Sequence, residues 1–590
     1  MNRCLITMIL LATVAVSGLA VNDRTYFPVD SEVYDLLRFV RLEAGLSIPW
    51  SSRSLTAHDV RRQLEPVEAA ELSSPGREAV ARIEALLEPD PVYQSPDEPF
   101  SFNMRPVLSL EGYLNTEGTP RDWLGSAYSD ETDNPGRLVY GDIPTSLWIG
   151  DRSPLVSFPA ELWAGDALYG RMDFDLLQAP VAALERERYA NVPLSVEDVD
   201  YMFPYRGFVF AGSDLWFLHV GRDQLRWGSG RTGVMALSDS PDYYDFVRFG
   251  VGSRRFRFTS LIAHLDPWVT RGDVERVDAA PGGDFGRWND REEVLGESDL
   301  DDFDPSDFSD RRGEAKVMHL NRVEVDLPGS VQLALNEGML YAGRRGDLRF
   351  LNPLMIYHNY FELGRGSAFL GLEGNWNPWR NMNLYGEFAL MQIGTEFKAD
   401  DIPDSFGWLA GAEGFIPIEQ GYLSAYGEFA YTNPFYGIRE EPLRSWHWRR
   451  RIMPNFGDIG GEIVTAPIGY RFGPDSAVIG GGVGYTAPGG YNIDLDLTYV
   501  RRGETRIDSA YEEGDEPVSR STPSGTAERA IILELGAGRR FPGLAGDLGL
   551  GDMDITVGLD TALISIENYR NISGETFLDL QVSPSVSLRF

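Results

Sequence analysis

One stretch of the sequence, Gly221 to Phe249, gathers the residue types that contact sugars and anions in proteins. Arginine supplies forked hydrogen-bond donors, aromatic rings offer an apolar face to a sugar, and glycine permits tight turns. The residues that we expect to bind a glycan are Arg222, Asp223, Arg226, Trp227, Arg231, Tyr243 and Tyr244. The same residue types favour equally a network of arginine and aspartate that folds a loop inward and blocks a lumen.

A pattern at the end of the sequence indicates which elements position these residues. From Leu578 to Phe590 the even positions are apolar, and the odd positions between them are polar. This period of two predicts a strand with one apolar face. Its terminal aromatic residue is typical of the closing strand of a bacterial outer-membrane barrel.

Similar alternation recurs from about residue 100 onward. The clearest further strands are Met382–Ile393, Leu423–Tyr431, Tyr491–Val500, Ile531–Ala537 and Met553–Leu563. Other spans begin near Phe102, Leu138, Leu155, Val209, Phe256, His319, Ser330 and Ala477. Because such barrels have even strand numbers, we expect an all-β transmembrane barrel of about 16–18 antiparallel strands over residues 100–590.

The composition favours this class. The chain has 63 glycines, 12% aromatic and 43% hydrophobic residues, and after the N-terminus it lacks the run of about 18 apolar residues that a spanning helix needs. The formal net charge of −36 argues against nucleic acid as a partner. This charge fits a solvated lumen and long outer loops, and an ordinary acidic surface would explain part of it.

The first twenty residues predict export. Arg3 is followed by an apolar run from Leu5 to Val16 and then by the small residues Gly18 and Ala20, as in a secretory signal peptide (residues 1–20). Cys4 is the only cysteine, so the mature chain would have no disulfide, zinc-thiolate or cysteine-nucleophile chemistry. We therefore expect the bacterial outer membrane as the location.

Residues 21–99 have a helical period instead. Val33, Leu36, Leu37 and Val40 follow helical spacing, Thr56 to Asp59 has the spacing of a capping box, and a serine and proline at 74 and 75 open a third helix. We expect a small periplasmic helical unit and linker. It would act as a plug or cap, or alternatively as a docking module for periplasmic or envelope assembly proteins.

Long polar insertions predict outer loops at Asn115–Gly136, Pro267–Gly313 and Arg502–Ala527. In Glu297–Asp310 half of the residues are acidic, but the run lacks the glycine and final glutamate of a calcium loop. We interpret it as a solvated segment, with cation binding as the less favoured alternative. The sequence therefore predicts no metal site and no cofactor.

A second group of aromatic residues has two interpretations. Trp376, Trp379, Trp446, His447 and Trp448 have basic neighbours and would suit stacking against sugars. An aromatic girdle at the membrane interface is the interpretation that we favour for most of these tryptophans.

The sequence gives little support for catalysis. None of the six histidines lies in a recognised nucleophile motif or in HExxH spacing. His358 beside Asn359 is the only pair that would suit a Ser/His/Asn arrangement, and a structural histidine is the simpler interpretation. We expect no enzymatic activity.

The chain resembles the capsule-assembly outer-membrane family known as Wzi. The resemblance rests on the segment G-R-D-x-x-x-W-G-x-G from Gly221 to Gly230, on the following Leu237 and Ser238, and on the helical opening D-S-x-V-Y-D-L-L from Asp30 to Leu37. It implies a closed barrel with a periplasmic helical cap that works as an outer-membrane lectin and retains capsular polysaccharide.

These observations give two expected functions. The first is a non-enzymatic outer-membrane protein that binds and retains surface polysaccharide, with membrane lipid and capsular polysaccharide as partners. The alternative is a cation-preferring or substrate-specific porin, because inward acidic residues such as Asp494 and Asp496 would attract cations. The two differ in whether Gly221–Phe249 folds inside the barrel and closes it.

Overall fold

The computed structural model of the chain describes residues 22–88, 91–95, 100–117, 137–139, 152–179, 190–268, 315–343, 366–392, 403–439, 442–452, 462–487, 490–507, 521–541 and 553–590. The expected signal peptide, the acidic run Glu297–Asp310 and the pair His358 and Asn359 lie outside these residues. So does most of the two long insertions after Asn115 and Pro267.

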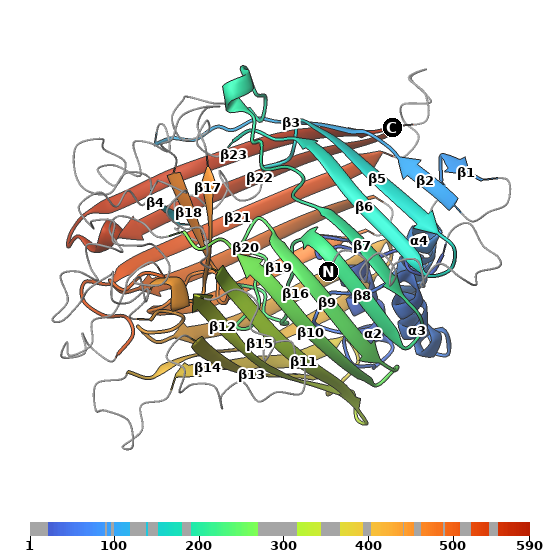
Figure 1. Ribbon diagram of the computed structural model, residues 1–590, viewed down its shortest axis with the longest axis horizontal. Helices are drawn as coiled ribbons and strands as arrows, with labels where there is room; N and C mark the ends of the chain where they lie inside the picture. Colours follow the sequence, from blue (N-terminus) through green and yellow to red (C-terminus); the bar gives the residue numbers. More distant parts are fainter. Residues whose placement is uncertain are drawn as a thin grey trace.

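Within the described residues, eighteen antiparallel strands form a closed barrel (Figure 1). Strands β2 and β3 share one place in the wall beside β5, and β23 pairs with β3 to close it. The first strands are β2 (Phe100–Met104), β3 (Val107–Glu111), β5 (Val156–Ala164), β6 (Leu168–Leu176), β7 (Gly207–Gly212), β8 (Trp216–Asp223), β9 (Tyr244–Gly252), β10 (Phe256–Leu265), β11 (Ala315–Leu327) and β12 (Val331–Gly343). The others are β13 (Gly366–Trp376), β14 (Met382–Gln392), β15 (Ser405–Ile418), β16 (Gly421–Thr432), β19 (Ser476–Thr486), β20 (Tyr491–Arg502), β21 (Glu528–Phe541), β22 (Asp554–Glu567) and β23 (Thr576–Arg589). The predicted strand number is confirmed.

Side chains alternate along these strands between the outer face and the lumen. On β23, Leu578 and Leu580 are exposed on the outer face, whereas Asp579 and Gln581 are buried on the inner face. An apolar outer face on a closed barrel suits contact with lipid, because closure leaves no unpaired strand edge in the hydrocarbon. The alternation predicted for the last strand is therefore confirmed.

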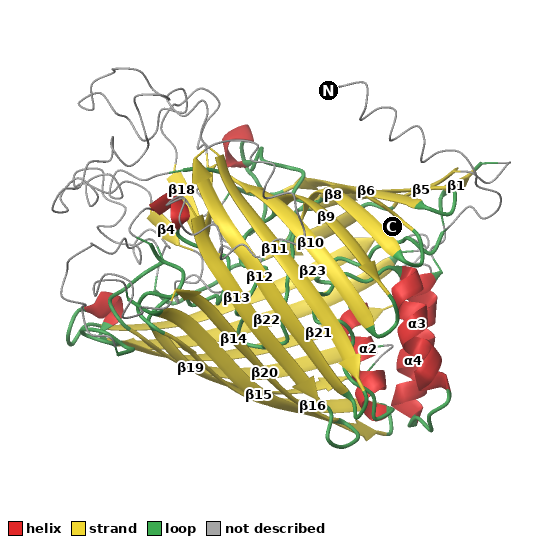
Figure 2. Ribbon diagram, turned by 60° about the horizontal axis from the view of Figure 1, so that its bottom comes forward, coloured by secondary structure: helices red, strands yellow, loops and turns green. Residues whose placement is uncertain are grey.

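The two ends of the barrel differ. At one end the strands join through short turns such as residues 253–255 and 419–420, and at the other the connections are long, for example residues 224–243. Barrels of this class have short periplasmic turns and longer outer loops, so we name these ends periplasmic and outer. Figure 2 shows the helices at the periplasmic end, close to the C-terminus.

Residues 22–88 form a helical unit at the periplasmic end, which we call the cap. Its helices are α2 (Val33–Glu43), α3 (Ala57–Glu68) and α4 (Ser74–Leu87). The capping box between Thr56 and Asp59 is formed as the spacing predicted. The apolar faces of the helices pack together and onto Phe415 and Tyr422 of the wall, with the Phe39 ring stacked 3.9 Å from the Tyr422 ring. Among the described helices, none is both long and apolar enough to cross a membrane.

The segment at Leu138 corrects one prediction. We expected a barrel span there, but β4 (Arg137–Val139) is a short strand that pairs in parallel with β18 (Glu462–Pro467), beside β17 (His447–Ile452). This small sheet lies at the outer end, opposite the helices (Figure 2). A three-residue strand is too short to cross the bilayer, which takes about 9–11 residues. The short β1 (Tyr93–Gln94) likewise lies outside the wall and pairs with β2.

Candidate functional site

The connection between β8 and β9 crosses the lumen, and we call residues 224–243 the lumen loop. The strands end side by side at the outer end, where Asp223 pairs with Tyr244. From there the loop extends to the periplasmic cap, and the Gly228 amide donates a hydrogen bond of 3.2 Å to the Ser51 carbonyl oxygen. The loop therefore spans the interior between the outer opening and the cap.

Glycine makes the tightest part of this path possible. Gly228 has a φ of 143°, which side-chain-bearing residues rarely adopt. A Cβ atom at this position would lie only 2.6 Å from a carboxylate oxygen of Glu387. The loop is also joined to itself, because the Trp227 amide donates to the Leu237 carbonyl oxygen at 2.8 Å.

Five glutamates on the facing wall receive the loop, and we call them the glutamate ladder. Their side chains are buried on the lumen side of β11 and of β13 to β16. The ladder consists of Glu324, Glu373, Glu387, Glu413 and Glu428. Because buried carboxylates are costly unless hydrogen-bonded, each needs donors inside the lumen.

The lumen loop supplies many of these donors from its backbone. Glu387 accepts hydrogen bonds from the amides of Ser229, Gly230 and Met235 at 2.6, 2.9 and 2.7 Å. The amides of Arg231 and Thr232 donate to Glu428, two strands further along the wall, at 2.7 and 2.9 Å. The loop is thus bonded to strands on the opposite side of the barrel from β8 and β9.

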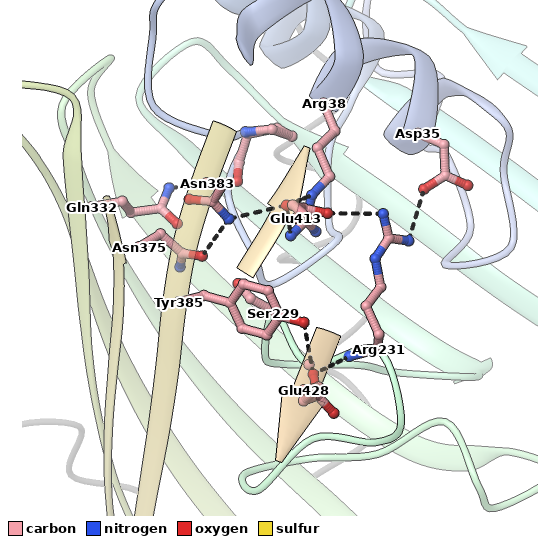
Figure 3. A network of polar contacts seen from close by, with 12 residues as sticks. Asp35, Arg38, Ser229, Arg231, Gln332, Asn375, Asn383, Tyr385, Glu413 and Glu428 are labelled. Atoms are coloured by element: carbon pink, nitrogen blue, oxygen red, sulfur yellow. Dashed lines mark hydrogen bonds and ion pairs between the residues drawn. The ribbon is translucent and has the colours of Figure 1, made fainter. Parts of the chain in front are cut away.

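Arginines neutralise the three other members of the ladder. Glu413 accepts from Arg231 of the lumen loop at 2.9 Å and from Arg38 of α2 at 2.6 Å (Figure 3). Arg322, which is fully buried, contacts Glu324 at 3.1 Å and Glu373 at 2.7 Å. These contacts join the cap, the loop and the wall in one buried polar network.

The predicted site residues fall into two groups, and the first lies at the outer end. The Arg222 guanidinium makes two hydrogen bonds to Asp245, at 2.8 and 2.7 Å, and lies 3.8 Å over the Tyr243 ring. Tyr205 stacks on Tyr243, and Trp448 contacts it edge-on. The side chains of Asp245 and Arg222 are 43% and 23% exposed, so this cluster is open to solvent on one side.

The second group lies within the loop and its attachments. Asp223 pairs with Arg206 at 2.8 Å, Tyr244 donates to the Ser238 carbonyl oxygen at 2.9 Å, and the Trp227 side chain is fully buried. Arg226 makes hydrogen bonds of 2.8 and 3.0 Å to Asp239. Burial alone would raise the pKa of the Asp239 carboxyl, but the Arg226 guanidinium outweighs this effect and holds that pKa below its ordinary value. Together with Arg231, these residues form an inward network of arginine and aspartate. The sequence favoured such a network as strongly as a glycan-binding site.

The second group of aromatic residues also divides between two places. Trp376 and Trp379 are 49% and 68% exposed near the periplasmic turns, as expected for an interfacial girdle. Trp446 and Trp448 are buried, and Trp446 donates to the Ser367 hydroxyl at 2.9 Å. The girdle interpretation is therefore wrong for these two, because the segment containing them folds into the outer part of the lumen.

Two histidines of the described residues, His219 and His447, are buried and have structural surroundings. His219 lies among the rings of Tyr26, Phe208 and Phe246, and its Nδ1 is 2.8 Å from Arg248. His447 is likewise buried, in the small outer sheet. Across the described residues there is no group of three or more histidine, aspartate and glutamate side chains that could hold a metal ion.

Comparison with solved structures identifies the architecture. Nearly the whole chain is similar to Wzi, an outer-membrane protein involved in group 1 capsule assembly in Escherichia coli and described as a carbohydrate-binding β-barrel. The alignment covers 96% of this chain and 99% of that chain, with a TM-score of 0.51 and 12% sequence identity. The chain has the Wzi fold. The fold expected from the sequence resemblance is therefore confirmed.

Other similarities are weaker. OccAB4 of Acinetobacter baumannii has 10% identity over 82% of this chain and 98% of that chain, with a TM-score of 0.34. OprD of Pseudomonas aeruginosa has 9% identity over 82% of this chain and 94% of that chain, also with a TM-score of 0.34. No protein-family model and no curated protein sequence matches the chain. The closed Wzi-like barrel with an apolar outer face locates the protein in the bacterial outer membrane, in contact with its lipid.

Sequence reasoning missed the glutamate ladder, although the sequence carries a signal for it. On four neighbouring strands of this Wzi-like barrel a glutamate lies next to glycine, in the runs GLEG, YGEF, GAEG and YGEF that contain Glu373, Glu387, Glu413 and Glu428. Each occupies an inward position between apolar outward neighbours. Repeated glutamates at inward positions of neighbouring strands predict a group of carboxylates, which must then be satisfied by something inside the lumen.

Proposed function

We propose that the protein binds and retains surface polysaccharide at the outer end of the barrel, without catalysis, as an outer-membrane lectin of the capsule-assembly type. The observation that carries this proposal is the half-open ion pair of Arg222 and Asp245, whose side chains are 23% and 43% exposed above the buried Tyr243 ring. Sugar hydroxyls form hydrogen bonds with charged groups of this kind. The description of Wzi as a carbohydrate-binding barrel supports the same function.

The two groups of site residues have different roles in this proposal. Arg222 contacts the polysaccharide together with the exposed edge of Asp245, and the buried Tyr243 ring supports Arg222 from beneath. Asp223, Arg226, Trp227, Arg231 and Tyr244 hold the lumen loop in place and so fix the position of the contact residues. The cap would face periplasmic or envelope assembly proteins, because it lies at the periplasmic end.

The proposal is tested by binding of polysaccharide extracted from the surface of the source bacterium to the refolded mature chain in detergent. Arg222→Ala removes both bonds to Asp245 and the contact with the Tyr243 ring, so we expect at least a tenfold loss of affinity, equivalent to about 1.4 kcal/mol. Arg529→Ala, which alters a solvent-exposed pair with Glu567, is the matched control and keeps full affinity. Equal affinity in the two variants would exclude this cluster as the contact site.

A porin is the second candidate, and one observation favours it. A cavity of about 800 Å³ lies between the cap and the wall at the periplasmic end, and Asp494, Asn492 and Thr486 are among its polar lining residues. Toward the outer end several inward residues of the same strands are apolar and buried, including Val500, Ile532 and Ile564. A polar cavity that ends at an apolar seal fits a closed barrel better than a conducting one.

Conductance separates the two candidates. We expect the refolded chain to give no steady current in a planar bilayer, because the lumen loop fills one half of the lumen and the apolar residues close the other. A steady, cation-selective current from the unaltered protein would favour the porin.

A further inference from the structure

The cap and the lumen loop, which approach from opposite ends of the barrel, contact the same wall residues. Around Arg322, Ser51 of the cap accepts a hydrogen bond from its guanidinium at 2.6 Å. On the other side, Glu373 accepts from Arg322 at 2.7 Å and from the Ser229 hydroxyl of the loop at 2.7 Å. Arg322 is thus enclosed between a cap residue and a loop-bound carboxylate.

The cap and the loop also touch each other at this point. The Gly228 amide donates to the Ser51 carbonyl oxygen, and Ser52 donates through its amide and hydroxyl to Glu324 at 3.3 and 2.9 Å. Arg322 donates to the same carboxylate. The contacts therefore close a ring of cap, loop and wall around a guanidinium that water does not reach.

Such a junction is stable only while all three parts are present. Charges and polar groups buried without partners are costly, whereas the same groups are inexpensive in water. If the loop leaves, Glu373 loses its Ser229 donor, Ser51 loses its Gly228 donor, and water reaches Arg322. Each cap bond at the junction then competes with water and contributes less to docking.

The second shared residue contributes less to the coupling. At Glu413, Arg38 of the cap and Arg231 of the loop bind one carboxylate, so their mutual repulsion opposes simultaneous docking. Removing Arg231 would leave the pair of Arg38 and Glu413 intact. The water-free ring around Arg322 is therefore the main link between the two parts, beside a long ion pair of 4.0 Å between Arg231 and Asp35 of α2.

We propose that the lumen loop and the cap form one latch through the Arg322 junction, so that displacing the loop at the outer end loosens the cap at the periplasmic end, and the reverse. The barrel wall is the fixed part of this device. Occupancy of the outer face is then communicated across the membrane without a conducting pore, through a coupling that acts equally in both directions.

Glu387 allows the loop to be released without touching the cap. Among the described residues, its hydrogen bonds come only from the loop amides of Ser229, Gly230 and Met235. Glu387→Gln replaces one acceptor oxygen with a donor that faces these amides, so the loop loses its central attachment. Glu528→Gln is the matched control, because Glu528 is equally buried on an inward face but pairs with Arg502 at the outer end of β21.

Single cysteines report on each part, since the sequence has no cysteine beyond Cys4. Ser47→Cys probes the cap, where Ser47 is buried against Asp326 of β11, and Ala236→Cys probes the loop. In the mature chain refolded into liposomes, we expect Glu387→Gln to raise the labelling rate at both positions by about tenfold or more, and Glu528→Gln at neither.

The reverse direction uses Phe39→Ala, which removes cap packing on Phe415 and Tyr422 and contacts no loop residue among those described. The latch requires faster labelling at Ala236→Cys in this variant. Circular dichroism checks that the barrel is folded, and Ser229→Ala is the milder replacement should Glu387→Gln fail to fold. A loop probe that labels fast while the cap probe stays at the unaltered rate would overturn the proposal.

Discussion

The lumen has two unlike halves, although both are built from strands with the same alternation. Along β11 to β16 the inward side chains are long, charged and buried, as at Arg322 and Glu413. Along β19 to β23 many are short, as at Thr486, Gly538 and Ser587, and these line the cavity of about 800 Å³. The alternation therefore specifies a barrel, while the size and charge of the inward residues decide which half is filled.

The polar contacts of the cap are also distributed unevenly around the barrel wall. Its hydrogen bonds and ion pairs reach β10 through Arg257 and Asp59, β11 through Ser52 and Glu324, and β15 through Arg38. The cavity lies between the cap and the wall, mainly along β19 to β23. One half of the periplasmic opening is thus closed by packing, and the other is a blind, hydrated recess.

The two halves should differ most in how much stability they lose when a carboxylate is removed from each. Glu413→Ala leaves Arg38 and Arg231 without their shared carboxylate, and breaking a buried pair in this way costs about 3–5 kcal/mol of stability. Asp494→Ala, in the cavity, should change stability by no more than about 0.5 kcal/mol. Unfolding in guanidinium of the two variants measures both values. Similar losses would mean that the two halves are not energetically distinct.

The second-largest expected effect is on conductance, and it comes from the buried apolar residues that lie above the cavity. Ile564 is fully buried, and Ile564→Ser removes burial worth about 1.5–3 kcal/mol while adding a polar group to the seal. Together with Val500→Ser it should let water connect the cavity with the outer end, so that a steady conductance appears in planar bilayers. Ser587→Ala, which changes only the cavity lining, is the control and stays silent. A silent double variant would place the closure elsewhere in the lumen.

The smallest effect concerns how acid affects the cap. Burial would raise the pKa of Asp59, but the Arg257 guanidinium and the capping-box hydrogen bonds outweigh it and hold this pKa below its ordinary value. A carboxyl with a lowered folded-state pKa stabilises the fold fully above its unfolded pKa, and this contribution fades as the pH falls through the folded value.

Relative to an exposed reference cysteine measured at the same pH, labelling at Ser47→Cys should therefore accelerate as the pH falls below about 4, where an unfolded aspartate takes up its proton. Asp59→Asn should label faster at neutral pH and show a shallower acid dependence, because it has no proton to gain. Identical pH profiles with and without Asp59 would remove this pair from the docking of the cap.

The sequence predicted local structure well because strand alternation and helix caps are local signals. The strands near Met382 and Tyr491 and the capping box at Thr56 formed as expected, since each depends on neighbours in the chain. The isolated strand at Leu138 was misassigned because three residues of alternation do not reveal their pairing partner. Its partner β18 lies more than 300 residues away in the sequence.

The candidate site was predictable in composition but not in position. The stretch from Gly221 was singled out by its arginines and aromatic residues, yet sequence alone left open whether these faced a ligand or each other. The answer depended on Glu387 and Glu413, which meet the stretch only across the folded lumen. Trp446 illustrates the same limit, because an exposed girdle tryptophan and a buried one have the same neighbours in the sequence.

The lumen loop also dictates an order of assembly. Ser229 and Thr232 bond to Glu373 and Glu428, which lie 144 and 196 residues further along the chain, and the wall closes only when β23 meets β3. Contacts between such distant segments form slowly. The loop, which comes early in the sequence, therefore stays unbonded to these carboxylates, which remain hydrated, until the later strands have joined the wall. We expect the expulsion of water from this half of the lumen to be among the last events of biogenesis.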